Sequence, residues 1–238
     1  MEVTVNMELL EAVSNIYEHL FRWRRGRFYG EKLYTTGATV PLKIRPGHFA
    51  TNHAHINYYI DVTTLKARTK EAEEVAQALV GMYLYDTVID TIVCMEGTEV
   101  IGAFLAEELA KGGFLSTNAH KSIYVISPEF NNNSQIIFRD NLIPMIRDKH
   151  VMILMASVTT GRTLNKAVES IQYYGGILQG ASAIFSAMDS LDGVPIKSVF
   201  GKKDLPDYTY SDYRDCPLCK AGKKIDALVN TFGYSPMG

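Results

Sequence analysis

Residues Val151 to Thr163 read Val-Met-Ile-Leu-Met-Ala-Ser-Val-Thr-Thr-Gly-Arg-Thr. The first five are apolar, a run that is too short for a helix and typical of a strand covered on both faces of a parallel sheet. Small and hydroxylated residues follow, and apolar residues then recur at helical spacing from Leu164 to Ile171. The segment therefore predicts a central strand, a tight loop and the start of a helix.

Such a loop gathers unpaired backbone N–H groups and the positive end of a helix dipole at the carboxyl edge of a sheet. Hydroxyl groups lie beside these amides, and Gly161 permits close approach of the backbone. This arrangement suits a bound phosphate. An ordinary turn, in which the threonines only cap the helix, explains the same residues. These residues are equally compatible with a phosphate site and with an ordinary capped turn.

The apolar strand that ends in Val-Thr-Thr-Gly-x-Thr resembles the binding motif of type I phosphoribosyltransferases, whose loop holds the 5-phosphate of phosphoribosyl pyrophosphate (PRPP). In that family two adjacent acidic residues normally hold the ribose hydroxyls, and Ala156 and Ser157 occupy their positions here. The resemblance implies that the phosphate cradle is kept while these ribose contacts are lost. The implied phosphate-binding residues are Ser157, Val158, Thr159, Thr160, Gly161, Arg162 and Thr163.

A second turn follows the short apolar strand over residues 90–95 and precedes a predicted helix over 100–111. In the orotate enzymes the corresponding loop contacts pyrophosphate through its backbone, which implies the same role here for Met95, Glu96, Gly97 and Thr98. Glu96 and Glu99 would repel a pyrophosphate unless a cation lay between them. An acidic first turn that favours the helix dipole explains both glutamates equally well.

The segment from Gly47 to Asp61 resembles a stretch of orotate phosphoribosyltransferases that reads Gly-x-Phe and then Tyr-Tyr-x-Asp. The resemblance implies a hood over the base that includes Phe49, Tyr58 and Tyr59. A lysine of that family touches the pyrophosphate, and Asn52 stands at the aligned position.

The polar segment from Ser127 to Gln135 predicts a flexible loop. The corresponding loop of the orotate enzymes carries lysines and closes over the pyrophosphate as it leaves. No Lys, Arg or His lies between Ser127 and Ile137, and Arg139 is the nearest substitute. Arg139, Glu96 and Glu99 are therefore the candidates for a catalytic role.

Two segments carry parts of a metal-binding pattern. Cys216-Pro217-Leu218-Cys219 is half of a zinc site, and a remote histidine or a second subunit would have to complete its four ligands. The histidines at positions 48, 53 and 55 lie in a strand-rich segment without a second cluster at ligand spacing. Neither segment predicts a metal by itself, and Cys216 and Cys219 stay candidates. The string Cys-Pro-Leu-Cys-Lys-Ala-Gly also resembles a C-terminal element of some orotate phosphoribosyltransferase-like proteins.

Length and composition indicate one globular domain. The chain has 238 residues, of which 47% are hydrophobic and 21% charged, and a net charge of −2 gives no support to nucleic acid as a partner. No apolar run is long enough for a membrane span, and the glutamates within the first 20 residues are unlike a signal peptide. We therefore expect a cytoplasmic protein without a membrane partner. A first helix is predicted from Met7 to Phe21.

The resemblance implies an α/β fold of the type I phosphoribosyltransferase kind, with a central, mainly parallel sheet flanked by helices. We expect a single domain over residues 1–238, with a core over about 62–200 and a small hood formed by about 30–61 and 201–238. The implied activity is transfer of a phosphoribosyl group from PRPP to a pyrimidine-type base with release of pyrophosphate, by a homodimer, with Mg²⁺ accompanying PRPP. The alternative is a noncatalytic homologue that binds a nucleotide or a phosphorylated sugar as a sensor or regulator.

Overall fold

The computed structural model describes residues 30–111, 116–119 and 122–237. The chain divides into two compact units, Met1–Glu31 and Lys32–Gly238, and the described helices and strands belong to the second, except that strand β1 (Glu31–Leu33) begins at the last residue of the first. The helix predicted from Met7 to Phe21 lies outside the described residues. Within the described residues, no helix combines the length and the apolar character that a membrane crossing requires.

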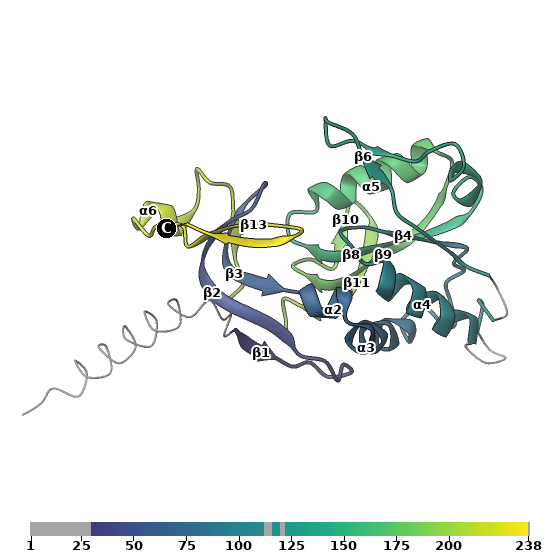
Figure 1. Ribbon diagram of the computed structural model, residues 1–238, viewed down its shortest axis with the longest axis horizontal. Helices are drawn as coiled ribbons and strands as arrows, with labels where there is room; N and C mark the ends of the chain where they lie inside the picture. The colour runs from purple at the N-terminus through teal and green to yellow at the C-terminus, as the bar shows by residue number, and fades with distance from the viewer. Residues whose placement is uncertain (1–29, 112–115, 120–121, 238) are drawn as a thin grey trace, which may run out of the picture. The chain divides into compact units, whose positions relative to one another are not determined.

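A six-stranded sheet forms the centre of the second unit (Figure 1). Its strands pair in the order β10-β11-β9-β8-β4-β5, and all neighbours are parallel except the antiparallel pair β10 and β11. The strand predicted from residue 151 is confirmed as β8, which lies between β9 and β4. The bounds are β4 (Thr91–Cys94), β5 (Tyr124–Ile126), β8 (His150–Val158), β9 (Ile177–Ser186), β10 (Ser190–Leu191) and β11 (Val194–Gly201).

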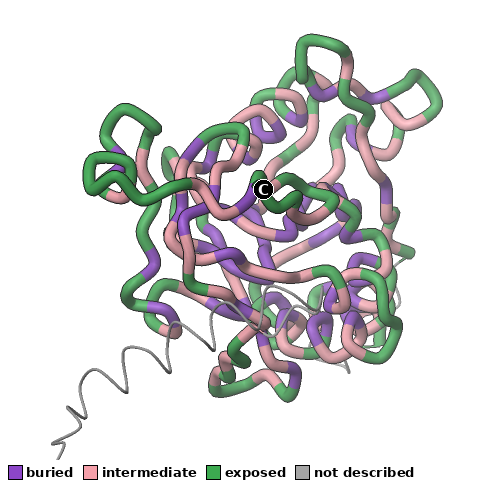
Figure 2. Tube along the Cα trace, turned by 60° about the vertical axis from the view of Figure 1, so that its left-hand side comes forward, coloured by how far each residue is buried: buried purple, intermediate pink, exposed green. Residues whose placement is uncertain are grey.

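Helices cover both faces of this sheet (Figure 1). Side chains alternate along β8, so Ile153 joins the apolar cluster that contains Ile171 of helix α5, whereas Met152 lies within 3.7 Å of Ser182 on the opposite face, where Tyr83 packs. The helices predicted over 100–111 and from Leu164 to Ile171 are confirmed as α4 (Glu99–Lys111) and α5 (Arg162–Tyr173). The other described helices are α2 (Thr63–Ala67) and α3 (Thr69–Val80), with a 3₁₀ turn at Ile143–Met145. Buried residues concentrate in these layers and exposed residues on the connecting loops (Figure 2).

A second sheet joins segments from the two ends of the described chain, as expected for a hood. Its strands pair in the order β12-β3-β2-β13-β14, and the C-terminal β13 runs parallel to β2 with Ala227 opposite Phe49. The hood elements are β1 (Glu31–Leu33), β2 (Leu42–Ala50), β3 (His55–Asp61), β12 (Tyr210–Ser211), α6 (Pro217–Lys220), β13 (Ala227–Asn230) and β14 (Gly233–Pro236).

The segment predicted as a flexible loop contains a small hairpin instead. Strand β6 (Glu129–Phe130) pairs with β7 (Ile136–Ile137), and the carboxamide oxygen of Asn131 accepts the N–H groups of Asn133 and Gln135 at 2.9 Å each. Polar composition alone predicts a turn without showing that its side chains close it.

Candidate functional site

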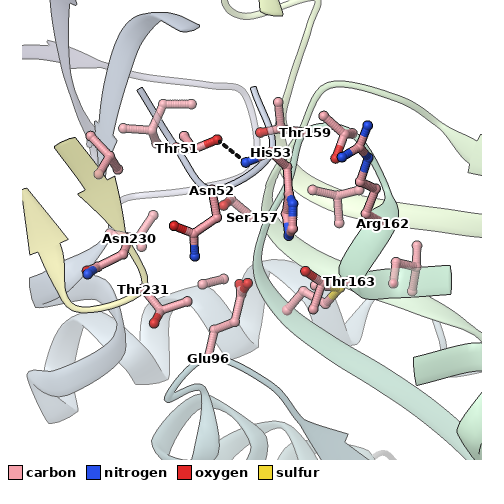
Figure 3. A pocket seen from close by; sticks show the side chains of 18 of the residues that line it. Thr51, Asn52, His53, Glu96, Ser157, Thr159, Arg162, Thr163, Asn230 and Thr231 are labelled. Atoms are coloured by element: carbon pink, nitrogen blue, oxygen red, sulfur yellow. Dashed lines mark hydrogen bonds between the residues drawn. The ribbon is translucent and has the colours of Figure 1, made fainter. Parts of the chain in front are cut away.

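A cavity of about 210 Å³ lies where the carboxyl end of β8 meets the start of α5 and the turns of the hood (Figure 3). Seven segments contribute to it: the β2–β3 turn, the end of β3 with α2, the β4–α4 turn, the end of β8, the β8–α5 connection, the first turn of α5, and the β13–β14 turn. Its lining residues include Thr51, Asn52, His53, Tyr59, Lys66, Glu96, Ala156, Ser157, Val158, Thr159, Thr160, Gly161, Arg162, Thr163 and Thr231.

All seven residues of the predicted phosphate loop line this cavity. Strand β8 continues to Val158, so the connection to α5 consists only of Thr159, Thr160 and Gly161. Gly161 is buried and has a φ of 73°, a backbone conformation that residues with a Cβ atom adopt at a cost. An added Cβ would lie 2.8 Å from Cδ2 of Leu191. Glycine is therefore favoured here by its backbone conformation, and an added Cβ would also displace the end of the Leu191 side chain.

The first turn of α5 is open toward the cavity. Gly161 is the N-cap residue, and the helix has no side-chain capping hydrogen bond there. The hydroxyl groups of Thr159 and Tyr208 lie 3.1 Å apart, so Thr159 has a partner other than the helix end. The first amides of an α-helix have no acceptor within the helix, and they carry the positive end of its dipole. This geometry favours an anion next to Arg162 and Thr163.

Glu96 projects into the cavity from the β4–α4 turn, toward Asn52 and Ser157 (Figure 3). Its backbone has a φ of 59°, which is uncommon for a residue other than glycine. Burial raises the pKa of the Glu96 carboxyl, while hydrogen bonds from the backbone N–H groups of Ser157 and Ala156 and the charge of Lys66 act in the opposite direction. A carboxylate thus lies against the two positions where the resembling family carries its acidic pair.

Lys66 is a cationic residue of the cavity lining that no sequence motif predicted. Its Nζ donates to the backbone oxygens of Glu96 at 2.6 Å and Thr231 at 3.3 Å, which joins α2 to the β4–α4 turn and to the β13–β14 turn. Burial of the ammonium group lowers the pKa of Lys66, and the neighbouring carboxylates, first that of Glu96, oppose this shift. No local pattern distinguishes Lys66 from a surface lysine, because its partners come from remote segments.

The β2–β3 turn supplies the polar wall of the hood. The hydroxyl group of Thr51 accepts the N–H groups of His53 at 3.2 Å and Ala54 at 2.9 Å, and this fixes the turn that presents Asn52 and His53 (Figure 3). Burial lowers the pKa of His53, and the positive charges of Arg162 and Lys166 lower it further. His53 is therefore a neutral imidazole at neutral pH, beside Arg162.

The aromatic residues predicted for the hood separate in the structure. Tyr59 lines the cavity and packs on Tyr234 with ring centroids 5.2 Å apart. Phe49 is buried and packs on Tyr59 at 6.0 Å, while neither Phe49 nor Tyr58 is a lining residue. Only one aromatic side chain of the three is thus placed to contact a ligand.

The remaining candidates lie outside the cavity lining. Nε of Arg139 donates to Glu129 at 2.9 Å, and Glu99 accepts the hydroxyl group of Ser127 at 2.7 Å. In the β4–α4 turn, Thr98 donates to the backbone oxygen of Leu154 at 3.0 Å and so fastens the turn to β8. Of Met95, Glu96, Gly97 and Thr98, Glu96 alone is a lining residue.

Comparison with known proteins gives a likeness of structure without one of sequence. No protein-family model matches the sequence, and no curated protein matches it. The solved structures that are similar to the chain include orotate phosphoribosyltransferase of Mycobacterium tuberculosis in complex with inorganic phosphate, at 15% identity over 63% of this chain and 81% of that one, with a TM-score of 0.44. UMP synthase of Leishmania donovani is 18% identical over 68% of this chain and 34% of that one, with a TM-score of 0.49. Adenine phosphoribosyltransferase of the same organism is 12% identical over 66% of this chain and 77% of that one, with a TM-score of 0.45. At identities of 12–18%, no substrate of these proteins is carried over to this chain.

Proposed function

We propose that the cavity binds the phosphate group of a phosphorylated ribose or nucleotide. The observation that carries this proposal is the first turn of α5, which has no side-chain cap at Gly161 and faces a 210 Å³ cavity at the carboxyl edge of a parallel sheet. Ligands of α/β proteins bind at this edge, and a helix N-terminus there attracts phosphate through its N–H groups and its dipole. Arg162 adds a positive charge at the same place.

The reaction that we propose for this site is phosphoribosyl transfer from PRPP to a pyrimidine-type base, with release of pyrophosphate. The bond from the ribose C1 to the pyrophosphate oxygen breaks as a bond from C1 to the base nitrogen forms. Such a reaction depends on orientation and on stabilisation of charge at the leaving group. Lys66 and Arg162 support the proposal because both cations line the cavity, and Asn52 and Tyr59 offer the hood side of the cavity to a base.

The alternative is a noncatalytic protein that senses or regulates through the same ligand, and two observations favour it. The Glu96 carboxyl occupies the cavity beside Ser157, so a phosphorylated ligand must approach an acidic group. Arg139 pairs with Glu129 at the exposed hairpin, so its charge is already partly neutralised there. Fewer groups are then free to stabilise a leaving pyrophosphate.

The residues present do not fit a magnesium site held by the protein. Mg²⁺ is bound through one or two carboxylates together with water and substrate phosphates. Glu96 is the acidic residue among the lining residues, and the Lys66 ammonium group, whose Nζ lies 2.6 Å from the Glu96 backbone oxygen, already brings a positive charge beside it. We propose that Mg²⁺ enters only as a complex with PRPP.

Calorimetry with matched ligands tests the phosphate site. We expect the full chain to bind ribose 5-phosphate and PRPP but not unphosphorylated ribose, and inorganic phosphate to compete. The Arg162→Gln variant should bind ribose 5-phosphate about tenfold more weakly, as expected for the loss of about 1.4 kcal/mol from one charged contact. Arg147→Gln is the matched control, because Arg147 is exposed and is not a lining residue. Equal binding of ribose and ribose 5-phosphate would refute the phosphate site.

Turnover separates the two functions. Each protein preparation that binds PRPP is incubated with orotate or uracil, with and without Mg²⁺, and released pyrophosphate is measured. Release of pyrophosphate that depends on the added base supports the transferase. Tight binding of PRPP or a nucleotide, without release of pyrophosphate in the presence of either base, supports the sensor. Sedimentation analysis of the same preparation tests our proposal that the chain forms a homodimer.

A further inference from the structure

Four side chains of the kinds that bind metal ions meet on the hood, away from the cavity. His48 lies on β2, His55 on β3, and Cys216 and Cys219 lie at α6. One ligand atom from each residue lies within 4.8 Å of the others, the only such group of three or more His, Cys, Asp or Glu residues in the described part of the chain. We infer that these four residues bind a structural Zn²⁺ ion.

The distances between the ligand atoms agree with a tetrahedral site. Zn–N bonds of about 2.05 Å and Zn–S bonds of about 2.3 Å place a nitrogen and a sulfur ligand about 3.5 Å apart, and two nitrogens about 3.3 Å apart. Nε2 of His48 lies 3.5 Å from Sγ of Cys216 and 3.7 Å from Sγ of Cys219. Nδ1 of His55 lies 3.3 Å from Sγ of Cys219 and 3.0 Å from Nε2 of His48. Four of the six distances between ligand atoms are therefore close to tetrahedral values, and the other two do not exceed 4.8 Å.

The tautomer of His48 is fixed by its second contact. Its Nδ1 lies 2.8 Å from the backbone oxygen of Lys223, and a carbonyl oxygen can only accept, so Nδ1 carries the proton. The Nε2 lone pair then points at His55 and the two sulfur atoms. Histidine ligands of metals commonly donate their other ring N–H to a carbonyl or carboxylate in this way, which orients the ring.

The surrounding backbone holds the group in place. His48 is 0% exposed and Cys216 is 2% exposed, so neither side chain can turn to solvent without opening the hood. The backbone N–H of His48 donates to a carboxylate oxygen of Asp226 at 2.7 Å, and the N–H of Asp226 donates to the backbone oxygen of His48 at the same distance. A buried imidazole lone pair that faces a second imidazole nitrogen and two thiols is costly unless a cation or a proton lies between them.

The chemistry of the set indicates zinc in a structural role. Two sulfur and two nitrogen ligands in a tetrahedral arrangement are characteristic of Zn²⁺, and four protein ligands leave no open position for a substrate. The ion would join α6 to the β2–β3 pair. Asp226 follows α6 and precedes β13, whose turn to β14 contributes Thr231 to the cavity wall, so the ion would also restrain that wall.

The competing state of the two cysteines is a disulfide within Cys216-Pro217-Leu218-Cys219, which would remove both sulfur ligands. Both cysteines have free thiols in the structure. A disulfide and a zinc site cannot exist in the same molecule, so the state of the thiols decides between them.

Metal analysis of the full-length protein tests the inference. The protein is purified under reducing conditions, incubated with Zn²⁺, dialysed, and analysed by elemental mass spectrometry together with the Cys219→Ser and His55→Ala variants. We expect about one zinc per wild-type chain, since all four ligands come from one chain, and a loss of at least tenfold in zinc affinity in each variant. Cys219 is exposed, so its replacement by serine tests the site with little effect on packing. His53→Gln is the matched control, because His53 belongs to the same segment but its side chain is not in the group. We expect it to keep its zinc.

Two further measurements on the wild-type protein do not depend on the folding of any variant. A chelator should lower the melting temperature of the wild-type protein, and added Zn²⁺ should restore it. The two hood thiols should react slowly with a thiol reagent and faster once the chelator is added. Wild-type protein that holds no zinc after reduction and zinc incubation, or a Cys216–Cys219 disulfide that forms in the presence of zinc, would overturn the inference. Retention of zinc by both variants would overturn it as well. None of these readouts depends on the function of the cavity.

Discussion

Replacing Gly161 with alanine should destabilise the protein and weaken phosphate binding at the same time. Gly161 joins β8 to α5 with a φ of 73°. The added Cβ atom would lie 2.8 Å from Cδ2 and 3.0 Å from Cδ1 of Leu191, which are the far end of a flexible side chain. The change therefore combines a backbone cost with a displacement of Leu191.

The two costs can be estimated separately. Alanine in the left-handed region costs about 1–2 kcal/mol, and the smaller conformational freedom of alanine in the unfolded chain returns about 0.4–1 kcal/mol. Moving Leu191 from its preferred rotamer adds about 0.5–1.5 kcal/mol. The net loss is about 2 kcal/mol, which corresponds to about 4–8 °C in melting temperature for a chain of this length.

Gly193→Ala is the matched control. Gly193 has a φ of 83°, no atom lies within 4 Å of an added Cβ, and the residue does not line the cavity. This variant should lose only the backbone cost, a net of about 1 kcal/mol, and should bind ribose 5-phosphate as the wild type does. Gly161→Ala should bind it about tenfold more weakly, because a shift of the first turn of α5 lengthens its hydrogen bonds to the phosphate.

Chemical denaturation of both variants, together with Leu191→Ala and the double variant Gly161→Ala/Leu191→Ala, measures each term in a double-mutant cycle. In the Leu191→Ala background, the cost of Gly161→Ala should fall to that of Gly193→Ala. Equal losses for the two glycine variants in the presence of Leu191 would contradict the contact argument. Unchanged phosphate affinity in Gly161→Ala would show that the anion lies elsewhere.

Three further predictions concern the groups around this loop. Lys66→Gln should weaken PRPP binding more than ribose 5-phosphate binding in calorimetry, because the pyrophosphate carries the additional charge; equal effects would place Lys66 away from the pyrophosphate. Burial raises the pKa of Glu96, so the folded protein holds that proton more tightly than the unfolded chain does, and stability from this group is lost as the pH rises from the unfolded pKa to the folded pKa. The stability of Glu96→Gln relative to wild type should therefore increase as the pH rises above 4.5, the ordinary pKa of a glutamate, in denaturant titrations, and a constant difference would refute this coupling. Tyr208→Phe removes the hydroxyl group that lies 3.1 Å from that of Thr159 and should cost about 1 kcal/mol by thermal unfolding, whereas no change would show that this contact is not formed.

Local patterns were sufficient to predict the elements of the core. The run that became β8 is apolar at every position because helices cover both faces of the sheet, and Leu164, Ala167, Val168 and Ile171 became the buried face of α5. The same reasoning located β4 and α4 within a residue of their observed bounds. Such patterns can be recognised in a sequence because apolar residues recur with different periods in helices and strands, and turn residues mark where an element ends.

The hairpin at residues 129–137 has a strand pairing that could not be predicted from local sequence patterns. Its composition indicates a turn, but the bond between Arg139 and Glu129 joins residues on both sides of the hairpin, and no periodicity records such a pairing. Arg139 was therefore a catalytic candidate in the sequence, whereas the structure assigns its charge to a neighbour outside the cavity lining.

The sequence by itself determined the strand, loop and helix at which we propose a phosphate site, because these elements depend on residues that are close together in the chain. Only the tertiary structure decided what surrounds this proposed site. Lys66 reaches Thr231 across 165 positions, and His48 meets Cys216 across 168. Local patterns specify which face of an element is buried and where the chain turns. Which two faces meet depends on strand pairing between remote segments, such as the parallel pairing of β13 with β2.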